Sequence, residues 1–185
     1  MLMRLCAWLL LHLRRRWYLG SSHTTKKGRD MSSYSILWHE ISTDVCKKLN
    51  VSDTSFSHEA YRDQIEVRNA RANAYLILIL ELILQEHRDK YSVPSVSLSG
   101  AAALHHKIFL KTKWLPQTIR DLSYEDCLFV LLEDLHPENL STESQNYLKI
   151  LEIQKSAFVL NKPLLEGWTP EKYGHHTSRL YQDNQ

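Results

Sequence analysis

The sequence predicts an all-α fold, an irregular bundle of five or six helices around a central long apolar helix. Two observations carry this prediction. Apolar residues recur every three or four positions through most of the chain, which is the period of an amphipathic helix. Glycine is scarce, with 5 residues among 185, and the 5 prolines fall between the periodic stretches. Tight β-turns need glycine at positive φ, whereas proline ends helices, so this composition favours helices over strands.

The first predicted helix covers residues 34–49. Four apolar side chains at helical spacing are expected to face the core, namely Ile36, Leu37, Ile41 and Val45. Two lysines stand near the end of this helix, where positive charge interacts favourably with the helix dipole. We therefore expect an amphipathic helix that packs by one face.

A longer helix is predicted from His58 to Lys90, with Ser57 as its N-terminal cap. Its first half is polar, and its second half, YLILILELILQ, is apolar almost all round. A helix that is apolar on every side normally lies inside a bundle, so this segment is the expected central helix.

Glu81 interrupts that apolar run. A buried carboxylate would have a raised pKa and would be a candidate functional group. However, Glu81 lies on a helix stripe with Asn73, Ile77, Gln85 and Arg88, and most of that stripe is polar. We therefore expect Glu81 at the outer edge of the helix.

Three further helices are predicted towards the C-terminus. One covers residues 98–113, and a second runs through CLFVLLEDL, where Ser123 and Asp126 form a capping box in front of it. The last begins near Thr142 and is expected to present one apolar face, made of Ile150, Ile153, Ala157 and Leu160.

The predicted domain organisation has three parts. Residues 31–160 form the helical domain, between a basic N-terminal extension at residues 1–30 and a C-terminal tail at residues 161–185. Leu164, Leu165 and Trp168 are the side chains that would anchor the tail.

The N-terminal extension holds seven basic residues and one acid, which leaves 16 basic and 20 acidic residues from Met31 onward. Its apolar stretch, LCAWLLLHL, would rise only about 14 Å as a helix, which is too short to span a bilayer. Three interpretations stay open. The extension is disordered and precedes a true start at Met31, or residues 4–18 lie on a membrane as a basic amphipathic helix, or a terminal helix docks on the core.

Several kinds of functional site are not expected. The spacing of the glycines leaves no room for a glycine-rich phosphate loop. The ten histidines include two adjacent pairs but no H-E-x-x-H, and the three cysteines form no C-x-x-C. We therefore predict no cofactor, no metal and no enzymatic activity. Reduced thiols are typical of a cytoplasmic protein, which is the expected location.

Protein–protein interaction is the predicted function. The polar first half of the long helix is expected to project beyond the core and to offer a surface for a partner or a second copy. The residues expected on this surface are Tyr61, Ile65, Arg68 and Arg71. A hydrolase or transferase built from scattered histidines and glutamates is a further alternative, because sequence cannot show which side chains converge.

A DNA-binding regulator is the main alternative. Residues 105–120 contain four basic residues and no acid, and the residues that would contact DNA are Lys107, Lys111, Lys113 and Trp114. The next 32 residues, 121–152, contain eight acids and one lysine. Those acids would repel phosphate, and they would equally well pair with the basic helix inside the bundle.

The stretch VSLSGAAALHHKIFLKTKWLPQTIRDLSYEDCLFVLLEDLHPENLS resembles small uncharacterised proteins of enterobacterial prophages. The resemblance covers residues 31–160. It implies a prophage-encoded accessory or regulatory factor and assigns no catalytic or binding residue.

Overall fold

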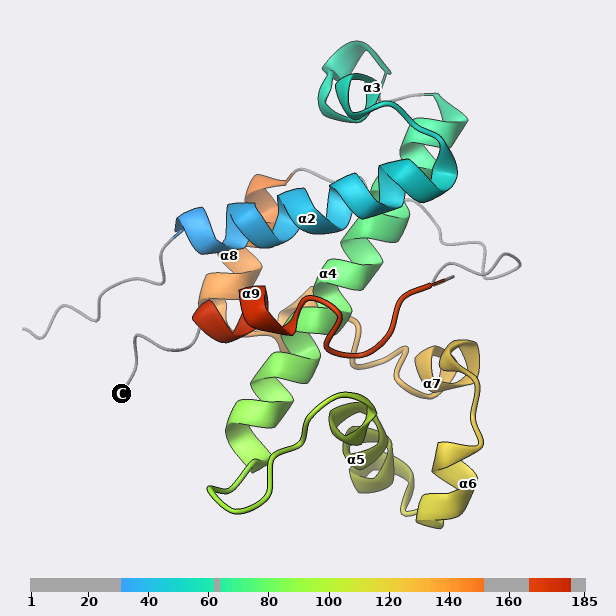
Figure 1. Ribbon diagram of the computed structural model, residues 1–185, viewed down its shortest axis with the longest axis vertical. Helices are drawn as coiled ribbons and strands as arrows, with labels where there is room; N and C mark the ends of the chain where they lie inside the picture. Colours follow the sequence, from blue (N-terminus) through green and yellow to red (C-terminus); the bar gives the residue numbers. More distant parts are fainter. Residues whose placement is uncertain (1–30, 62–63, 152–166, 181–185) are drawn as a thin grey trace, which may run out of the picture.

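The computed structural model describes residues 31–61, 64–151 and 167–180, and these are helical with no β-strand, which confirms the all-α prediction (Figure 1). The elements are α2 (Met31–Leu49), α3 (Asp53–Ser57), the 3-10 turn η1 (Glu59–Tyr61), α4 (Ile65–Tyr91), α5 (Ala101–Thr112), α6 (Pro116–Arg120), α7 (Tyr124–Val130), η2 (Pro137–Asn139), α8 (Thr142–Ile150) and α9 (Gly174–Arg179). None of the helices in these ranges has the length and apolar character needed to cross a membrane.

Some sequence predictions fall outside the described residues. They concern the N-terminal extension at residues 1–30, its membrane-contact segment at residues 4–18, and five apolar side chains expected near the C-terminus, which are Ile153, Ala157, Leu160, Leu164 and Leu165.

α4 follows the long axis of the molecule and contacts α2, α3, α5 and α9 (Figure 1). α2 crosses its upper part, and α5 packs beside its lower part with α6 and α7 against α5. The core is built mainly between these helices, because every residue from Leu76 to Gln85 on α4 is buried.

α2 packs by one face, as predicted, but the face differs by one residue. Tyr34, Leu37 and Ile41 are fully buried, whereas Ile36 is 44% exposed. Ile36 was expected in the core and that prediction is wrong. Successive residues turn by about 100° around a helix, so the stripe through Tyr34, Leu37 and Ile41 leaves Ile36 on the opposite side.

The predicted long helix is broken near its start. Ser57, expected as its cap, is instead the last residue of α3, and α4 begins at Ile65 after η1. Ser52 caps α3, since its hydroxyl accepts a hydrogen bond from the Ser55 backbone N–H at 3.0 Å. The Ser- and Thr-rich stretch thus satisfies its own backbone locally, which competes with a continuous helix. The buried side chain of Phe56 packs α3 against the core.

Glu81 is fully buried, with 0% of its surface exposed. The prediction that it marks the outer edge of the helix is wrong. The polar stripe that it shares with Gln85 and Arg88 does exist, but the C-terminal part of the chain covers it. His87 is buried as well, so the buried half of α4 is less apolar than expected and the description of an apolar central helix is not confirmed.

The segment expected to be a C-terminal tail belongs to the core over the part that the structure describes. Trp168, Tyr173, Thr177 and Leu180 are each at least 95% buried. α9 contacts both α2 and α4. The sequence suggested a tail because polar residues separate these side chains, but a short strap needs only a few large side chains to dock.

Two predicted helix starts can be compared with their caps. The Ser123 hydroxyl accepts from the Asp126 backbone N–H at 3.1 Å, which confirms the cap of α7. α8 begins at Thr142, as predicted, and its cap is Ser141, whose hydroxyl accepts a hydrogen bond from the Ser144 backbone N–H. Ile150 was expected on the apolar face of this last helix, and that prediction is wrong, because its side chain is 62% exposed. Tyr147 and Leu148 form the buried face instead.

Candidate functional site

The turn between α5 and α6 carries several exposed apolar side chains beside a hollow. α5 ends at Lys113, whose backbone is left-handed with φ of 58° and whose N–H donates to the Phe109 carbonyl at 2.8 Å. Pro116 then starts α6, where its missing N–H costs nothing. The chain therefore reverses within three residues and points Trp114 and Leu115 outward.

These side chains surround a shallow hollow of about 410 Å³, lined by Lys113, Trp114, Leu115 and Thr118. Leu115 is 74% exposed, Trp114 is 44% exposed and Phe109 is 37% exposed. The Lys113 ammonium lies 5.6 Å from the centre of the Phe109 ring. We call Phe109, Lys113, Trp114, Leu115 and Thr118 the aromatic corner.

Two of the four residues predicted to contact DNA form partly exposed ion pairs with acidic residues that follow α7. Lys107 Nζ lies 2.9 Å from Asp134, and Lys111 Nζ lies 2.8 Å from Asp134 and 2.9 Å from Glu133. The other two predicted residues, Lys113 and Trp114, belong to the aromatic corner. The structure therefore separates the predicted DNA-contact residues into an acid-paired half on α5 and an exposed half at the turn.

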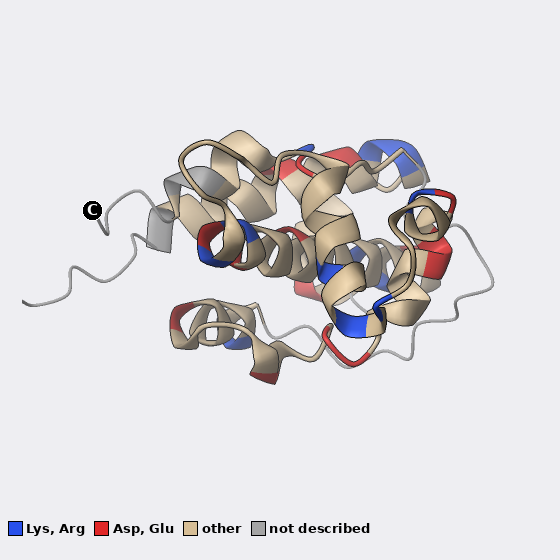
Figure 2. Ribbon diagram, turned by 90° about the horizontal axis from the view of Figure 1, so that it is seen from below, with Lys and Arg blue, Asp and Glu red and all other residues tan. Residues whose placement is uncertain are grey.

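The pKa values of this charge cluster follow from its geometry. Burial alone would raise the pKa of Asp134, but hydrogen bonds from Lys111 and Lys107 outweigh it, so the pKa lies below the ordinary value. Hydrogen bonds to Asp134 and Glu133 raise the pKa of Lys111. In the view of Figure 2, ribbon segments that hold Lys or Arg lie among segments that hold Asp or Glu.

The predicted partner surface is only partly assembled. Tyr61 on η1 is 41% exposed, Ile65 at the start of α4 is 56% exposed, and Arg68 is exposed. Arg71 differs, because its Nη1 donates to the Phe56 carbonyl at 2.9 Å and its guanidinium lies 5.4 Å from the Phe56 ring. Arg71 therefore holds α3 onto α4, while the other three residues form the exposed arm of the molecule.

The strongest polar cluster that the sequence did not reveal is the buried stripe of α4. The Trp168 indole N–H donates to Glu81 Oε1 at 2.8 Å. Gln85 Oε1 accepts from the Thr177 hydroxyl at 3.1 Å and from Arg88 Nε at 3.2 Å. The spacing of Glu81, Gln85 and Arg88 was visible in the sequence, but nothing there indicated which segment would cover it.

Burial raises the pKa of Glu81 to about 7. The hydrogen bond from Trp168 and the positive charge of Arg88 oppose this rise, while the negative charge of Glu171 adds to it. Oε2 of Glu81 and Nη1 of Arg88 are buried without a hydrogen-bond partner. The stripe is therefore polar and only partly satisfied.

The histidines do not form a metal site within the described ranges, which contain no group of three possible metal-ligating side chains. His87 Nε2 lies 2.9 Å from His106 Nδ1, and Tyr91 packs against both rings. Burial and the nearby Lys107 lower the pKa of His87 to about 4, so its imidazole is neutral at neutral pH.

Cys46 and Cys127 are buried free thiols. Burial raises the pKa of both thiols to about 11, and the nearby Asp53 and Asp126, respectively, add to the rise. Since the thiolate is the reactive form, both cysteines are unreactive at neutral pH.

Comparison with protein-family models, with curated proteins and with solved structures produced no match. The resemblance to prophage proteins therefore stays a prediction, and functional inference rests on the geometry of this chain.

Proposed function

We propose that this chain is a non-enzymatic binding protein that takes a segment of a partner protein on the aromatic corner. The observation that carries the proposal is the exposure of Trp114 and Leu115 beside a hollow at the turn between α5 and α6. Exposed aromatic residues next to apolar pockets are typical anchors of protein interfaces, where they contribute much of the binding energy.

The chemistry of the corner indicates the chemistry of the partner segment. Residues 105–120 contain no acid, and Lys113 stands at the rim of the hollow. An apolar side chain of the partner would fill the hollow against Leu115, and a neighbouring carboxylate would meet the Lys113 ammonium. The partner segment is therefore an apolar one that also carries negative charge.

The non-enzymatic part of the proposal is supported by the state of the reactive side chains. Glu81 is sealed from solvent, both described thiols have raised pKa values, and His87 is held neutral. A general acid or base must reach its substrate, and a nucleophile must be activated. These groups meet neither condition.

The DNA-binding alternative has weaker support. Lys107 and Lys111 already contact Asp134 and Glu133, and these carboxylates would repel a phosphate backbone. Only the exposed half of the predicted contact residues, Lys113 and Trp114, is available without breaking ion pairs.

Selection of peptides from a random display library on the full chain tests the proposal. We expect enriched peptides to combine aromatic or aliphatic residues with Asp or Glu, and to lose at least about tenfold in affinity on Trp114→Ala. Lys113→Glu should disfavour the acidic peptides. Ile150→Ala, which changes an equally exposed residue on α8, is the matched control and should leave binding unchanged.

Three outcomes would overturn the proposal. The first is that enriched peptides bind equally well to the Trp114→Ala and wild-type chains. The second is that a random DNA duplex binds at about 50 mM salt through Lys113, with affinity that falls steeply as salt rises, which would support the DNA-binding regulator. Dimerisation of the chain that Trp114→Ala abolishes would instead make a second copy the occupant and would also contradict a foreign partner.

A further inference from the structure

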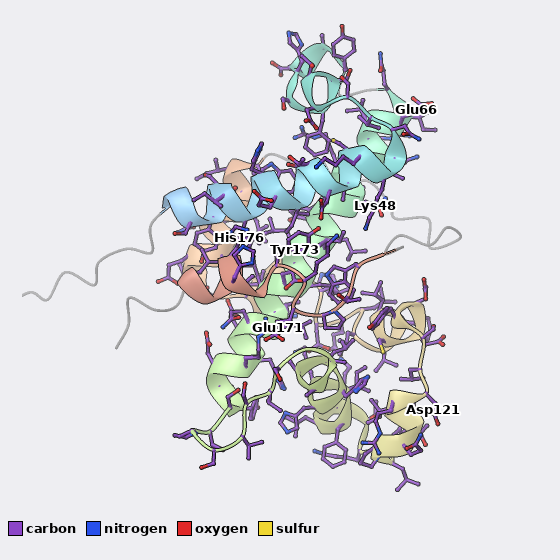
Figure 3. All side chains as sticks on the ribbon, viewed as in Figure 1. Lys48, Glu66, Asp121, Glu171, Tyr173 and His176 are labelled. Carbon is purple, nitrogen blue, oxygen red and sulfur yellow. The ribbon has the colours of Figure 1, made fainter. Side chains whose placement is uncertain are left out.

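The last described segment, residues 167–180, is a strap that crosses between α2 and α4 (Figure 3). It touches three parts of the fold through polar contacts. Lys172 Nζ lies 2.7 Å from Asp44 on α2, and the Tyr173 hydroxyl donates to the same carboxylate at 2.9 Å. The carboxylate of Glu171 accepts from the Gly100 backbone N–H in front of α5.

The contact of the strap with α4 runs through the buried polar stripe. Trp168 and Thr177 donate hydrogen bonds to Glu81 and Gln85, respectively. The Trp168 ring also packs edge-on against Tyr124 of α7, with ring centres 5.6 Å apart. The strap is thus held at two positions of the stripe, and Glu81 lies under its first large side chain.

The charge of Glu81, which lies in this contact, depends on pH near neutrality. When protonated it is a neutral group that accepts one hydrogen bond from Trp168. When ionised it places a charge at a position with 0% exposure, where Oε2 has no donor. A buried charge with an incomplete set of partners is costly, and the cost disappears if the site opens to water.

The charges that face Glu81 from the surrounding elements do not cancel this cost. Arg88 on α4 and Lys172 on the strap favour the ionised form, and Glu171 on the strap opposes it. From the strap, Tyr173 also faces Glu81, but its hydroxyl is committed to Asp44 of α2. Two nitrogens of Arg88, Nε and Nη2, donate hydrogen bonds to Oε1 of Gln85.

We propose that the strap is a pH-dependent clasp, closed over α4 while the Glu81 carboxyl is protonated and loosened when that carboxyl ionises. Opening exposes the stripe of α4 and lets water solvate the Glu81 carboxylate. The proposal is independent of the aromatic corner, which lies on α5 and α6.

The direction and size of the effect follow from proton linkage. The pKa of Glu81 is about 7 under the closed strap and would be near its ordinary 4.5 in the open state. The closed strap is therefore most favoured at pH below the open-state pKa of Glu81. The closing equilibrium becomes less favourable as pH rises from the open-state pKa to the closed-state pKa, and it changes no further at higher pH. Between pH of about 5 and about 8, the closing equilibrium should weaken roughly 70-fold.

Hydrogen exchange of backbone amides in the full chain measures this equilibrium directly. After correction for the intrinsic exchange rate, the protection of residues 167–180 should fall by tens of fold between those two pH values. The amides of Leu76 to Gln85 in α4 should keep their protection, which separates strap opening from global unfolding. Equal loss in α4 and the strap would overturn the clasp.

Glu81→Gln is the matched variant, because it keeps the shape and the acceptor for Trp168 but cannot ionise. Its strap protection should vary by less than about threefold over the same pH range. If wild type and Glu81→Gln show the same pH dependence, Glu81 does not control the strap and the proposal fails.

A second measurement keeps the proposal testable if Glu81→Gln fails to fold. The carboxyl carbon of Glu81, followed by NMR in the wild-type chain, should titrate with a pKa well above its ordinary value. Trp168→Phe should move this pKa higher still, since the lost indole hydrogen bond favours the ionised form. Titration at the ordinary pKa in the wild-type chain would overturn the proposal.

Discussion

The indole nitrogen of Trp168 lies 2.8 Å from Oε1 of Glu81, although 87 residues separate the two in the chain. This contact closes the C-terminal strap over the longest helix and converts a polar stripe on α4 into part of the interior. It also gives the chain an ionisable group in its core whose pKa burial raises to about 7.

The strap should contribute to global stability as a part of the core does. Leu180 is 2% exposed, so we expect Leu180→Ala to lower the free energy of unfolding by about 2–4 kcal/mol. Ile150→Ala, at a residue that is 62% exposed, should change it by less than about 0.5 kcal/mol. Urea unfolding of both variants tests this prediction. A similar small effect for both would mean that the strap is not docked in solution.

Arg71 and Arg68 offer a matched pair on the exposed arm. Arg71→Ala should lower the free energy of unfolding by about 1–2 kcal/mol, because Arg71 donates a hydrogen bond to the Phe56 carbonyl. The same change should increase hydrogen exchange in α3. Arg68→Ala should be nearly neutral, because its side chain is exposed. Arg68→Glu then reports on the predicted partner surface without unfolding α3. If Arg68→Glu leaves partner capture and oligomeric state unchanged, Arg68 is not part of that surface.

His87 should stay neutral well below the usual range of histidine. Its pKa is about 4, with burial as the main cause. The Cε1 proton shift of His87 should therefore titrate near that value in NMR spectra. Because the folded state disfavours protonation, this residue is expected to lower stability as pH falls from about 6.5 to about 4, by roughly 3 kcal/mol. A midpoint near 6.5 would contradict the burial of this side chain.

Asp134 should stabilise the fold at neutral pH through its two lysines. Its pKa is below the ordinary value, so the stabilisation is present above that value and is lost as pH falls through the lowered pKa. Asp134→Asn should lower the free energy of unfolding by about 1 kcal/mol at neutral pH, a modest effect because the ion pairs are partly exposed. In strong acid the effect should be much smaller. Thermal unfolding at both pH values measures the difference. A cost that does not change with pH would argue against the ion pairs.

Local signals predicted most of the helices. The cap at Ser123 predicted the start of α7, and the periodic apolar residues of α2 and α5 located those helices to within a few residues. The last helix was correctly predicted to begin near Thr142, but its predicted apolar face was wrong at Ile150. The errors arose where two local signals compete. Ser57 was expected to begin a long helix, but Ser52 and its neighbours satisfy the backbone earlier and give α3. The short α6 was not predicted, because a five-residue helix has too few turns to show a period.

The sites were harder to predict than the helices. Lys107, Lys111, Lys113 and Trp114 stand close together in the sequence, yet the structure engages the first two with Glu133 and Asp134 and exposes the last two. The aromatic corner could be suspected from its residues, but the left-handed backbone at Lys113 that turns it outward is a property of the folded chain.

By itself, the sequence determined the helical class, most of the buried face of α2 and the existence of a stripe through Glu81, Gln85 and Arg88. These are consequences of the fixed rotation per residue in a helix, which acts over a few positions. The tertiary structure alone decided whether that stripe meets water or protein. Burial depends on which distant segment docks, and docking is set by the summed packing of side chains such as Trp168 and Leu180, far away in the chain.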